Sequence, residues 1–429
     1  MTQNKIILIC LLTIATLHTK AQQNSNPKSE AVRAITNTMK FSGNIQTWAR
    51  MMQYNTGSTI FGYKKDKGAD VGIRRVRLNL TGTPTEKITY YVQASLNNFN
   101  SLSDRKLGLF ISDANADYKV YKNHLDIGMG LSAWSGLSRF SSPSTISFLG
   151  IDGPLFLQTT NDVTDQFFRK LSVYAKGKIN HFDYRIVLAQ PMAIQKSNSF
   201  TSIGYNANFS ARPAKLQTNA YFQYQFFDIE SNTTAYTAGT YIGKKKVFNI
   251  GLGYIYQPKA MWQLGTANDT IENNLLQAAI DVFYDAPIGK NGEALSVYGC
   301  YLHSDFGTNY YRNTAVMNPT NGLVGNHLNG SGNGYPAVGT GESGYLQAGY
   351  KLKDDLIKSA TLMPYASVYF NKLQRFVDPI IFYDLGLNVL LNGHFSKITL
   401  AYQNRPLMNS ASQVDSRKSA LLIQYQTAF

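Results

Sequence analysis

The chain has little charge, little cysteine and, beyond its first residues, no long apolar run. Charged residues make up 16% of the 429 positions, below the roughly 25% of soluble domains. Two Cys residues exclude a disulfide scaffold. No stretch after residue 21 approaches the about 20 apolar residues that a membrane-spanning helix needs. Tyr and Phe are abundant instead, at 28 and 23 residues, and this excludes a disordered chain.

The first 21 residues have the features of a secretory signal peptide. Lys5 precedes an apolar run over 6–17, and Ala21 closes a cleavage site. A membrane anchor is disfavoured because the run has only about 12 residues, whereas a span needs about 20. We therefore predict a signal peptide over 1–21 and a polar periplasmic lead-in over 22–39.

Apolar residues recur with a period of two along most of the remaining chain. In the stretch 88–96, every second residue from Ile88 to Leu96 is apolar, and most of the intervening ones are polar. This is the pattern of a strand with one buried face. Many such stretches are longer than the roughly five or six residues of soluble strands and match the about 9–11 of membrane strands. The eighteen candidate strands are 40–54, 71–83, 86–98, 109–121, 124–133, 167–178, 181–191, 203–212, 214–227, 234–243, 246–257, 273–284, 293–305, 343–353, 361–371, 380–391, 394–404 and 418–429.

The connections between these strands fall into two groups. Those after even-numbered strands are mostly short, such as 122–123, whereas those after odd-numbered strands include 134–166 and 306–342. Short turns on one side and long loops on the other are typical of outer-membrane barrels. We predict an all-β fold: a closed antiparallel transmembrane β-barrel of about 16 to 18 strands over 40–429, in the outer membrane of a Gram-negative bacterium. A soluble secreted β-protein that binds glycans is the alternative.

The C-terminal strand and the stretch 325–344 carry further sequence signals. The last strand alternates apolar residues and ends in Phe429, a pattern similar to the signal that the barrel assembly machinery reads. The wall itself should contact outer-membrane lipid and lipopolysaccharide. Residues 325–344 are rich in Gly and Asn, and this composition predicts a mobile surface loop.

A barrel of this width leaves an aqueous lumen that wall side chains cannot fill. Connection 134–166 is unusually apolar for a solvated loop. It should therefore pack against another part of the protein. It resembles the third loop of general porins, which folds into the barrel, and on that resemblance we expect it to fold inward and to form a constriction with Trp134, Asp152 and Phe156. Two alternatives stay open, in which the loop covers the barrel mouth or contacts another subunit.

The strongest charge feature is the basic strand at 74–82. Its apolar residues should face lipid, which directs Arg75 and Arg77 into the lumen, because a lipid-facing Arg costs about 2–4 kcal/mol at the midplane. The same parity directs Lys170 and Arg185 inward. Arg139 would join them if the loop folds inward, with Asp152 as counter-charge. Such basic groups would favour anions, unless the inward charges only balance one another.

The basic strand Arg74–Gly82, followed by the aromatic stretch 90–93, resembles the opening hairpin of the phosphate-selective porin O and P family. The strand pair at 113–131 and the C-terminal strand are similar as well. The resemblance implies a homotrimeric, anion-conducting porin of 16 strands that passes phosphate or other small anions. The residue usage is similar to that of Bacteroidota.

No motif for an enzyme, metal site or cofactor is present: HExxH, CxxC and P-loop patterns are all missing. Nucleic-acid binding is also not expected, because the basic residues are spread over strands and turns. We predict an ion channel, namely a porin for passive diffusion of small polar solutes with a preference for anions. A barrel with a structural or adhesive role is the alternative.

Overall fold

The computed structural model describes residues 38–104, 108–157, 169–195, 201–354 and 356–429. The predicted signal peptide and nearly all of the lead-in over 22–39 lie outside these residues. Among the residues described, no helix is long and apolar enough to cross a membrane.

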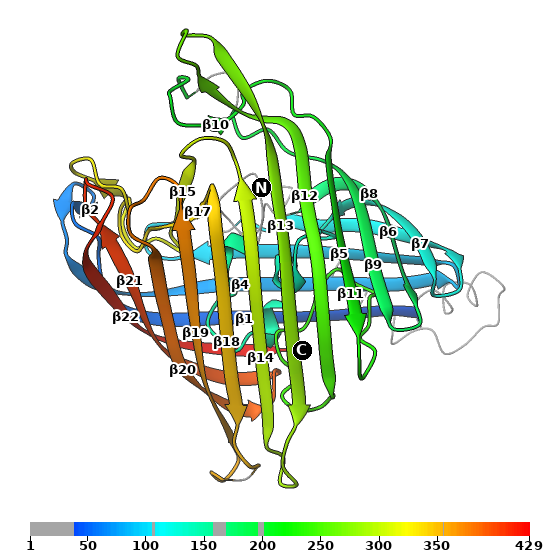
Figure 1. The fold of residues 1–429 in the computed structure, drawn as a ribbon. Coiled ribbons are helices and arrows are strands. Elements are labelled where there is room, and N and C mark those ends of the chain that lie inside the picture. The colour runs from blue at the N-terminus through cyan, green and yellow to red at the C-terminus, as the bar shows by residue number, and fades with distance from the viewer. Residues whose placement is uncertain (1–37, 105–107, 158–168, 196–200, 355) are drawn as a thin grey trace, which may run out of the picture.

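Within the described residues, sixteen antiparallel strands form one closed barrel (Figure 1). The first strand pairs with both the second and the last barrel strand, which closes the ring. The amide of Phe429 also donates to the Gly43 oxygen at 2.9 Å, and the Gly43 amide donates back at 2.9 Å. The barrel strands are β1 (Met39–Gln53), β4 (Lys67–Thr85), β5 (Ile88–Phe99), β6 (Phe110–Tyr121), β7 (Leu125–Ser132), β8 (Lys170–Ile179), β9 (Phe182–Gln190), β11 (Gln217–Gln225), β12 (Val247–Leu264), β13 (Thr270–Pro287), β14 (Ala294–Asp305), β18 (Gly341–Lys351), β19 (Thr361–Leu373), β20 (Ile380–Asn392), β21 (Ser396–Met408) and β22 (Val414–Ala428).

Short elements lie in the connections. Among them, β15 pairs with β17, and β16 pairs with β2. The short elements are β2 (Ser58–Ile60), β3 (Tyr63–Lys64), β10 (Asn208–Phe209), β15 (Tyr311–Thr314), β16 (Gly322–Leu323), β17 (Tyr335–Gly339) and the 3-10 helices η1 (Arg139–Ser141), η2 (Thr145–Ser147) and η3 (Leu155–Leu157).

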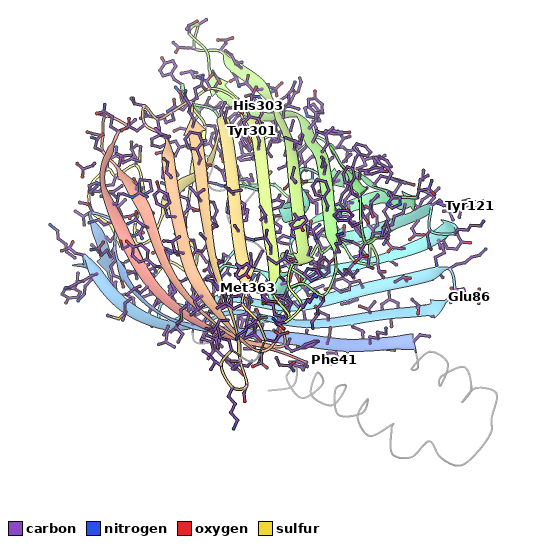
Figure 2. The ribbon with its side chains drawn as sticks, turned by 60° about the horizontal axis from the view of Figure 1, so that its bottom comes forward. Phe41, Glu86, Tyr121, Tyr301, His303 and Met363 are labelled. Atoms are coloured by element: carbon purple, nitrogen blue, oxygen red, sulfur yellow. The ribbon has the colours of Figure 1, made fainter. Side chains whose placement is uncertain are left out.

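The alternation predicted from the sequence corresponds to two faces of the barrel wall. On β12, Ile250 and Leu252 are exposed, whereas Asn249 and Gln257 are buried. Apolar side chains therefore face outward, where lipid would cover them, and polar side chains face the interior. Figure 2 shows Tyr301 at the outer face of β14, where its side chain is exposed.

Two of the eighteen predicted strands are wrong. Residues 203–212 contribute only the two residues of β10 to the sheet. Residues 234–243 contain no barrel strand, and none of their side chains is fully exposed. Ala235 and Ile242 are buried there, so their alternation reflects packing inside the barrel and not contact with lipid.

Connections on the two sides of the barrel differ mostly as predicted. The long outer connection 306–340 packs on the barrel: the Asn329 side chain donates to the Pro406 oxygen at 2.9 Å and is fully buried. Its burial differs from the mobile loop that composition predicts at 325–344. On the periplasmic side most connections are short turns, but β11 and β12 are joined by the long segment 226–246.

Candidate pore site

The outer connection after β7 lies against the inner wall of the barrel. Along its path, the Gly136 amide donates to the Asn219 side chain on β11 at 2.6 Å. Farther on, the Asn388 side chain on β20 donates to the Leu149 oxygen at 2.8 Å. These strand residues are buried and face the interior. The described part of the loop, 133–157, therefore covers the wall from β11 round to β21, where Lys397 donates to the Phe148 oxygen.

Aromatic packing holds the two ends of this segment. The Trp134 ring lies 5.5 Å from that of Tyr174 on β8, and the Phe156 ring lies 6.0 Å from that of Tyr369 on β19. Both loop residues are buried. They fix the loop to the wall, and neither lines the two cavities described below. The remainder of the predicted loop, 158–166, lies outside the described residues.

A second segment enters the barrel from the periplasmic end. We call residues 230–241, part of the connection between β11 and β12, the lumenal strap. The strap meets the inward loop, where the Ser144 amide donates to the Thr237 oxygen at 2.8 Å. The Thr237 amide donates to the Ser142 oxygen at 3.0 Å. Loop and strap thus form a continuous hydrogen-bonded layer inside the barrel.

The space left beside this layer is a cavity of about 240 Å³ along β1, β4 and β5, which we call the arginine cavity. Its position near the first residues of β1 and the last of β4 places it in the periplasmic half of the barrel. Three arginines line it, and no Asp or Glu is among its described lining residues. The lining includes Ser42, Asn44, Arg75, Arg77, Asn79, Thr81, Tyr91, Gln93, Arg169, Thr234 and Tyr236.

An ion pair separates this cavity from a smaller one of about 50 Å³ in the outer half. Arg75 lines the inner cavity, and Asp152 of the loop lines the outer one. The Arg75 Nη2 atom lies 2.5 Å from Asp152 Oδ1, and the Arg74 Nη2 atom lies 2.9 Å from the same oxygen. A solute that moved from one cavity to the other would have to pass these three groups.

A β-bulge brings the two adjacent arginines to the same face. In the pairing with β1 the register of β4 passes from Ile73, opposite Thr47, to Arg75, opposite Gln46, so Arg74 is an extra residue in that pairing. An extra residue of this kind turns the strand locally, and Arg74 is buried like Arg75. Strict alternation places Arg74 toward lipid, so alternation alone does not predict this residue in the site. Two neighbouring Arg residues in a membrane strand are the signal that could have revealed the bulge.

Comparison with known proteins agrees with this geometry. The sequence model of the family "Phosphate-selective porin O and P" matches residues 45–241. The chain is an outer-membrane porin. It resembles the phosphate-selective family over that range, and this resemblance together with the barrel fold indicates a channel. Among curated proteins, no sequence matches this porin.

Solved structures share the porin's fold at low sequence identity. OprB of Pseudomonas putida is 11% identical, with a TM-score of 0.56, over 94% of this chain and 96% of that chain. OmpF of Salmonella typhi, in complex with daunomycin, is 10% identical, with a TM-score of 0.53, over 90% and 97%. The outer-membrane channel DcaP of Acinetobacter baumannii is 11% identical, with a TM-score of 0.51, over 91% and 97%.

The other two cavity arginines of the porin have fixed neighbours. Arg77 Nη1 donates to the Asn97 side chain at 2.5 Å and to the Leu96 oxygen at 3.3 Å. Arg169, which the sequence analysis did not select, pairs with Asp113 of β6 at 2.9 Å. Its position beside Lys170 repeats the signal of two adjacent cations at a barrel strand.

The three remaining predicted basic residues lie elsewhere in the barrel. Lys170 Nζ donates to the Gln217 side chain at 2.6 Å. The Arg185 guanidinium lies 5.1 Å from the Trp134 ring centroid and 5.4 Å from that of Tyr221. Arg139 pairs with Glu230 of the strap, and none of the three lines the arginine cavity. The five predicted groups therefore do not form one cluster.

The Arg139–Glu230 pair is a buried ion pair between loop and strap. Arg139 Nη2 lies 2.5 Å from Glu230 Oε1, and both side chains are buried. Burial lowers the pKa of Arg139, but the charge and hydrogen bond of Glu230 together with nearby tyrosines raise it overall. Burial likewise raises the pKa of Glu230, yet the Arg139 charge holds it below its usual range. Both groups therefore stay ionised near neutral pH.

Proposed function

We propose that this porin is a passive diffusion pore that prefers small anions, and that solutes pass along the wall formed by β1, β4 and β5. The observation that carries the proposal is the cavity lined by Arg75, Arg77 and Arg169, with no carboxylate among its described lining residues. Groups of arginine in a narrow passage attract anions and repel cations. The wall opposite these strands is covered by the inward loop and offers less open space.

The ion pair between the two cavities suggests how an anion would pass. Asp152 occupies the guanidinium groups of Arg74 and Arg75 as a passing carboxylate or phosphate would. An entering anion would compete with Asp152 for these donors, and a guanidinium can offer two parallel hydrogen bonds to such a group. Because the protein's own carboxylate competes, a solute would be held weakly and released again.

Several finer points are part of the same proposal. Phosphate is one candidate solute, because of the resemblance to the phosphate-selective family over residues 45–241. Lys170, Arg185 and Arg139 would act on passing ions only through long-range attraction, since none of them lines the cavity. We also propose a homotrimer in the outer membrane, which semi-native gels of unheated protein and cross-linking in membranes would test.

Reversal potentials in planar bilayers test the proposal. In a KCl gradient, wild-type protein should show anion preference, and the Arg75→Ala, Arg77→Ala double variant should shift toward cations. Part of the preference should weaken at high salt, because the Debye length falls from about 10 Å at 0.1 M to about 3 Å at 1 M. The matched control is Arg212→Gln, an exposed arginine outside the described cavity lining, which should leave selectivity unchanged.

A second candidate is a closed barrel with a structural or adhesive role. It is favoured by the outer connection 306–340, which covers the barrel mouth in this conformation. Arg50 Nη2 donates to the Met317 oxygen at 2.6 Å, and Arg405 Nη2 donates to the Gly332 oxygen at 3.0 Å. Folded protein that leaves bilayers silent would favour this role. A conducting protein that prefers cations would instead be a general diffusion pore.

A further inference from the structure

The lumenal strap is held in place from several strands at once. Lys176 Nζ on β8 donates to the Thr233 oxygen at 3.2 Å. His394, in the periplasmic turn between β20 and β21, contacts the Thr240 oxygen through Nε2 at 2.9 Å. The Thr240 hydroxyl donates to Asp285 on β13 at 2.7 Å. Contacts to such widely separated strands indicate that the strap crosses the periplasmic end of the lumen.

The face of the strap that is turned toward β4 and β5 lines the arginine cavity. Thr234 and Tyr236 belong to that lining, together with Arg77 and Arg169. The Tyr236 hydroxyl accepts from Arg169 Nη2 at 2.7 Å and donates to Asp113 at 2.6 Å. The strap therefore forms one wall of the cavity and also positions one of its charges.

The pattern of burial separates the strap from an ordinary periplasmic turn. Residues 226–229, which precede it, are exposed, and Ser231 is exposed as well. Ala235 is buried with Trp134 and Tyr174. The exposed part can meet the periplasm, while the buried part is packed between the barrel wall and the inward loop.

We propose that the lumenal strap is a second restriction of the pore, built from the periplasmic side, and that Thr234 and Tyr236 are specificity-determining residues. This inference rests on the proposed function, because it assumes that solutes move through the arginine cavity. The inward loop and the strap then narrow the lumen from opposite ends and meet at Thr237. A solute would pass between the strap on one side and the wall of β4 and β5 on the other.

Cysteine modification tests the strap without removing it. In Thr234→Cys, a thiosulfonate reagent carrying a negative sulfonate should attach inside the cavity. Single-channel current in KCl should then fall several-fold and anion preference should decrease, whereas a reagent carrying trimethylammonium should reduce the current while anion preference stays the same or rises. Cys300 is buried, so the unsubstituted protein should show no change. Mass spectrometry would report how much of the thiol has reacted.

The matched control is Ser231→Cys, an exposed position on the same strap that does not line the cavity. Its modification should leave current and selectivity unchanged. The inference is overturned if Thr234→Cys reacts without any change in current, if its thiol does not react in folded protein, or if the control responds equally. If the strap inference fails but the wild-type protein conducts with anion preference, the proposed function as an anion-preferring pore is still supported. If the folded wild-type protein does not conduct at all, both the proposed function and the strap inference are wrong.

Discussion

The two sides of the barrel interior differ in what covers their polar side chains. On the side of β11 to β21, the loop supplies fixed partners: Lys397 Nζ donates to the Phe148 oxygen at 2.6 Å. On the side of β1, β4 and β5, Arg75 and Arg77 border an open cavity. Basic side chains that face inward by the same alternation therefore pack against the loop on the side of β11 to β21. On the side of β1, β4 and β5 they can contact solutes. What decides between these roles is whether a loop covers the wall, and strand parity carries no information about that.

The covered side also shows how a wide barrel buries charge. Asp281 accepts from the Tyr221 hydroxyl at 2.9 Å, the Tyr298 hydroxyl at 3.0 Å and the Arg139 amide at 2.5 Å. A buried carboxylate is tolerated only when such donors replace water. Because sixteen strands enclose more space than wall side chains can fill, the loop and the strap provide the missing partners.

The largest effect, on the free energy of unfolding, should come from removing the buried Arg139–Glu230 ion pair on the side of the barrel that the loop covers. Glu230→Gln would leave the Arg139 guanidinium buried without a carboxylate. Removing one member of a buried pair costs about 3–5 kcal/mol, so the free energy of unfolding should fall by about that amount. Guanidinium unfolding in detergent micelles would measure it, and hydrogen exchange should show faster exchange at the strap amides.

The pair Arg212–Glu272, in which the arginine side chain is exposed, is the natural control for that variant, because it has the same residue types near the surface. Arg212→Gln should leave unfolding unchanged, since surface ion pairs contribute little. If the two variants unfolded alike, the Arg139–Glu230 pair would not fasten the loop to the strap, and the distinction between covered and open sides would lose its energetic basis.

A smaller effect should follow from changing the open side. Asp152→Asn removes the carboxylate that occupies Arg74 and Arg75, so both guanidinium groups become more available to passing anions. Anion preference in a KCl gradient should rise, and conductance at low salt should rise with it. Asp104→Asn, on an exposed outer connection, should change neither. Unchanged selectivity in Asp152→Asn would show that the ion pair does not lie on the solute path.

Most of the wall could be predicted from the sequence because lipid on one face enforces alternation. The predicted strand 394–404 corresponds to β21, and 380–391 corresponds to β20, with ends shifted by only a few residues. The same signal failed at 234–243, because a segment packed inside the lumen also alternates between buried and less buried side chains. A period of two arises whether the apolar side chains of a segment face lipid or pack against protein inside the lumen, so the period alone cannot distinguish these two cases.

The site could be predicted only in part. Parity correctly directed Arg75 and Arg77 to the interior, where both are buried. It could not place Arg74, because a bulge changes parity by one residue. It also could not foresee Glu230 as the partner of Arg139, since that contact joins two connections rather than two strands. Contacts between loops depend on the closed barrel and have no local signal.

The smallest effect should be a change with pH at the periplasmic anchor of the strap. Burial, together with the nearby Lys397 and Lys244 charges, lowers the pKa of His394 from 6.5 to about 3. The ring is therefore neutral, and its Nε2–H donates to the Thr240 oxygen. When the turn opens, the ring regains its ordinary pKa and takes up a proton below about pH 6.5. The closed conformation should lose stability as pH falls through the interval from about 6.5 to 3.

Hydrogen exchange of the strap amides measured from pH 7 downward would test this, after correction for the intrinsic pH dependence of exchange. Glu230 adds a separate loss, because its pKa is held below 4.5 and its contribution disappears only when pH falls through that lowered value. The interval between about 6.5 and 4.5 therefore separates the effect of His394 from that of Glu230. The His394→Gln variant keeps an N–H donor but cannot titrate, so its strap should be equally protected across that interval. If this variant kept the pH dependence of the wild type, the contact between His394 and the Thr240 oxygen would not be its cause.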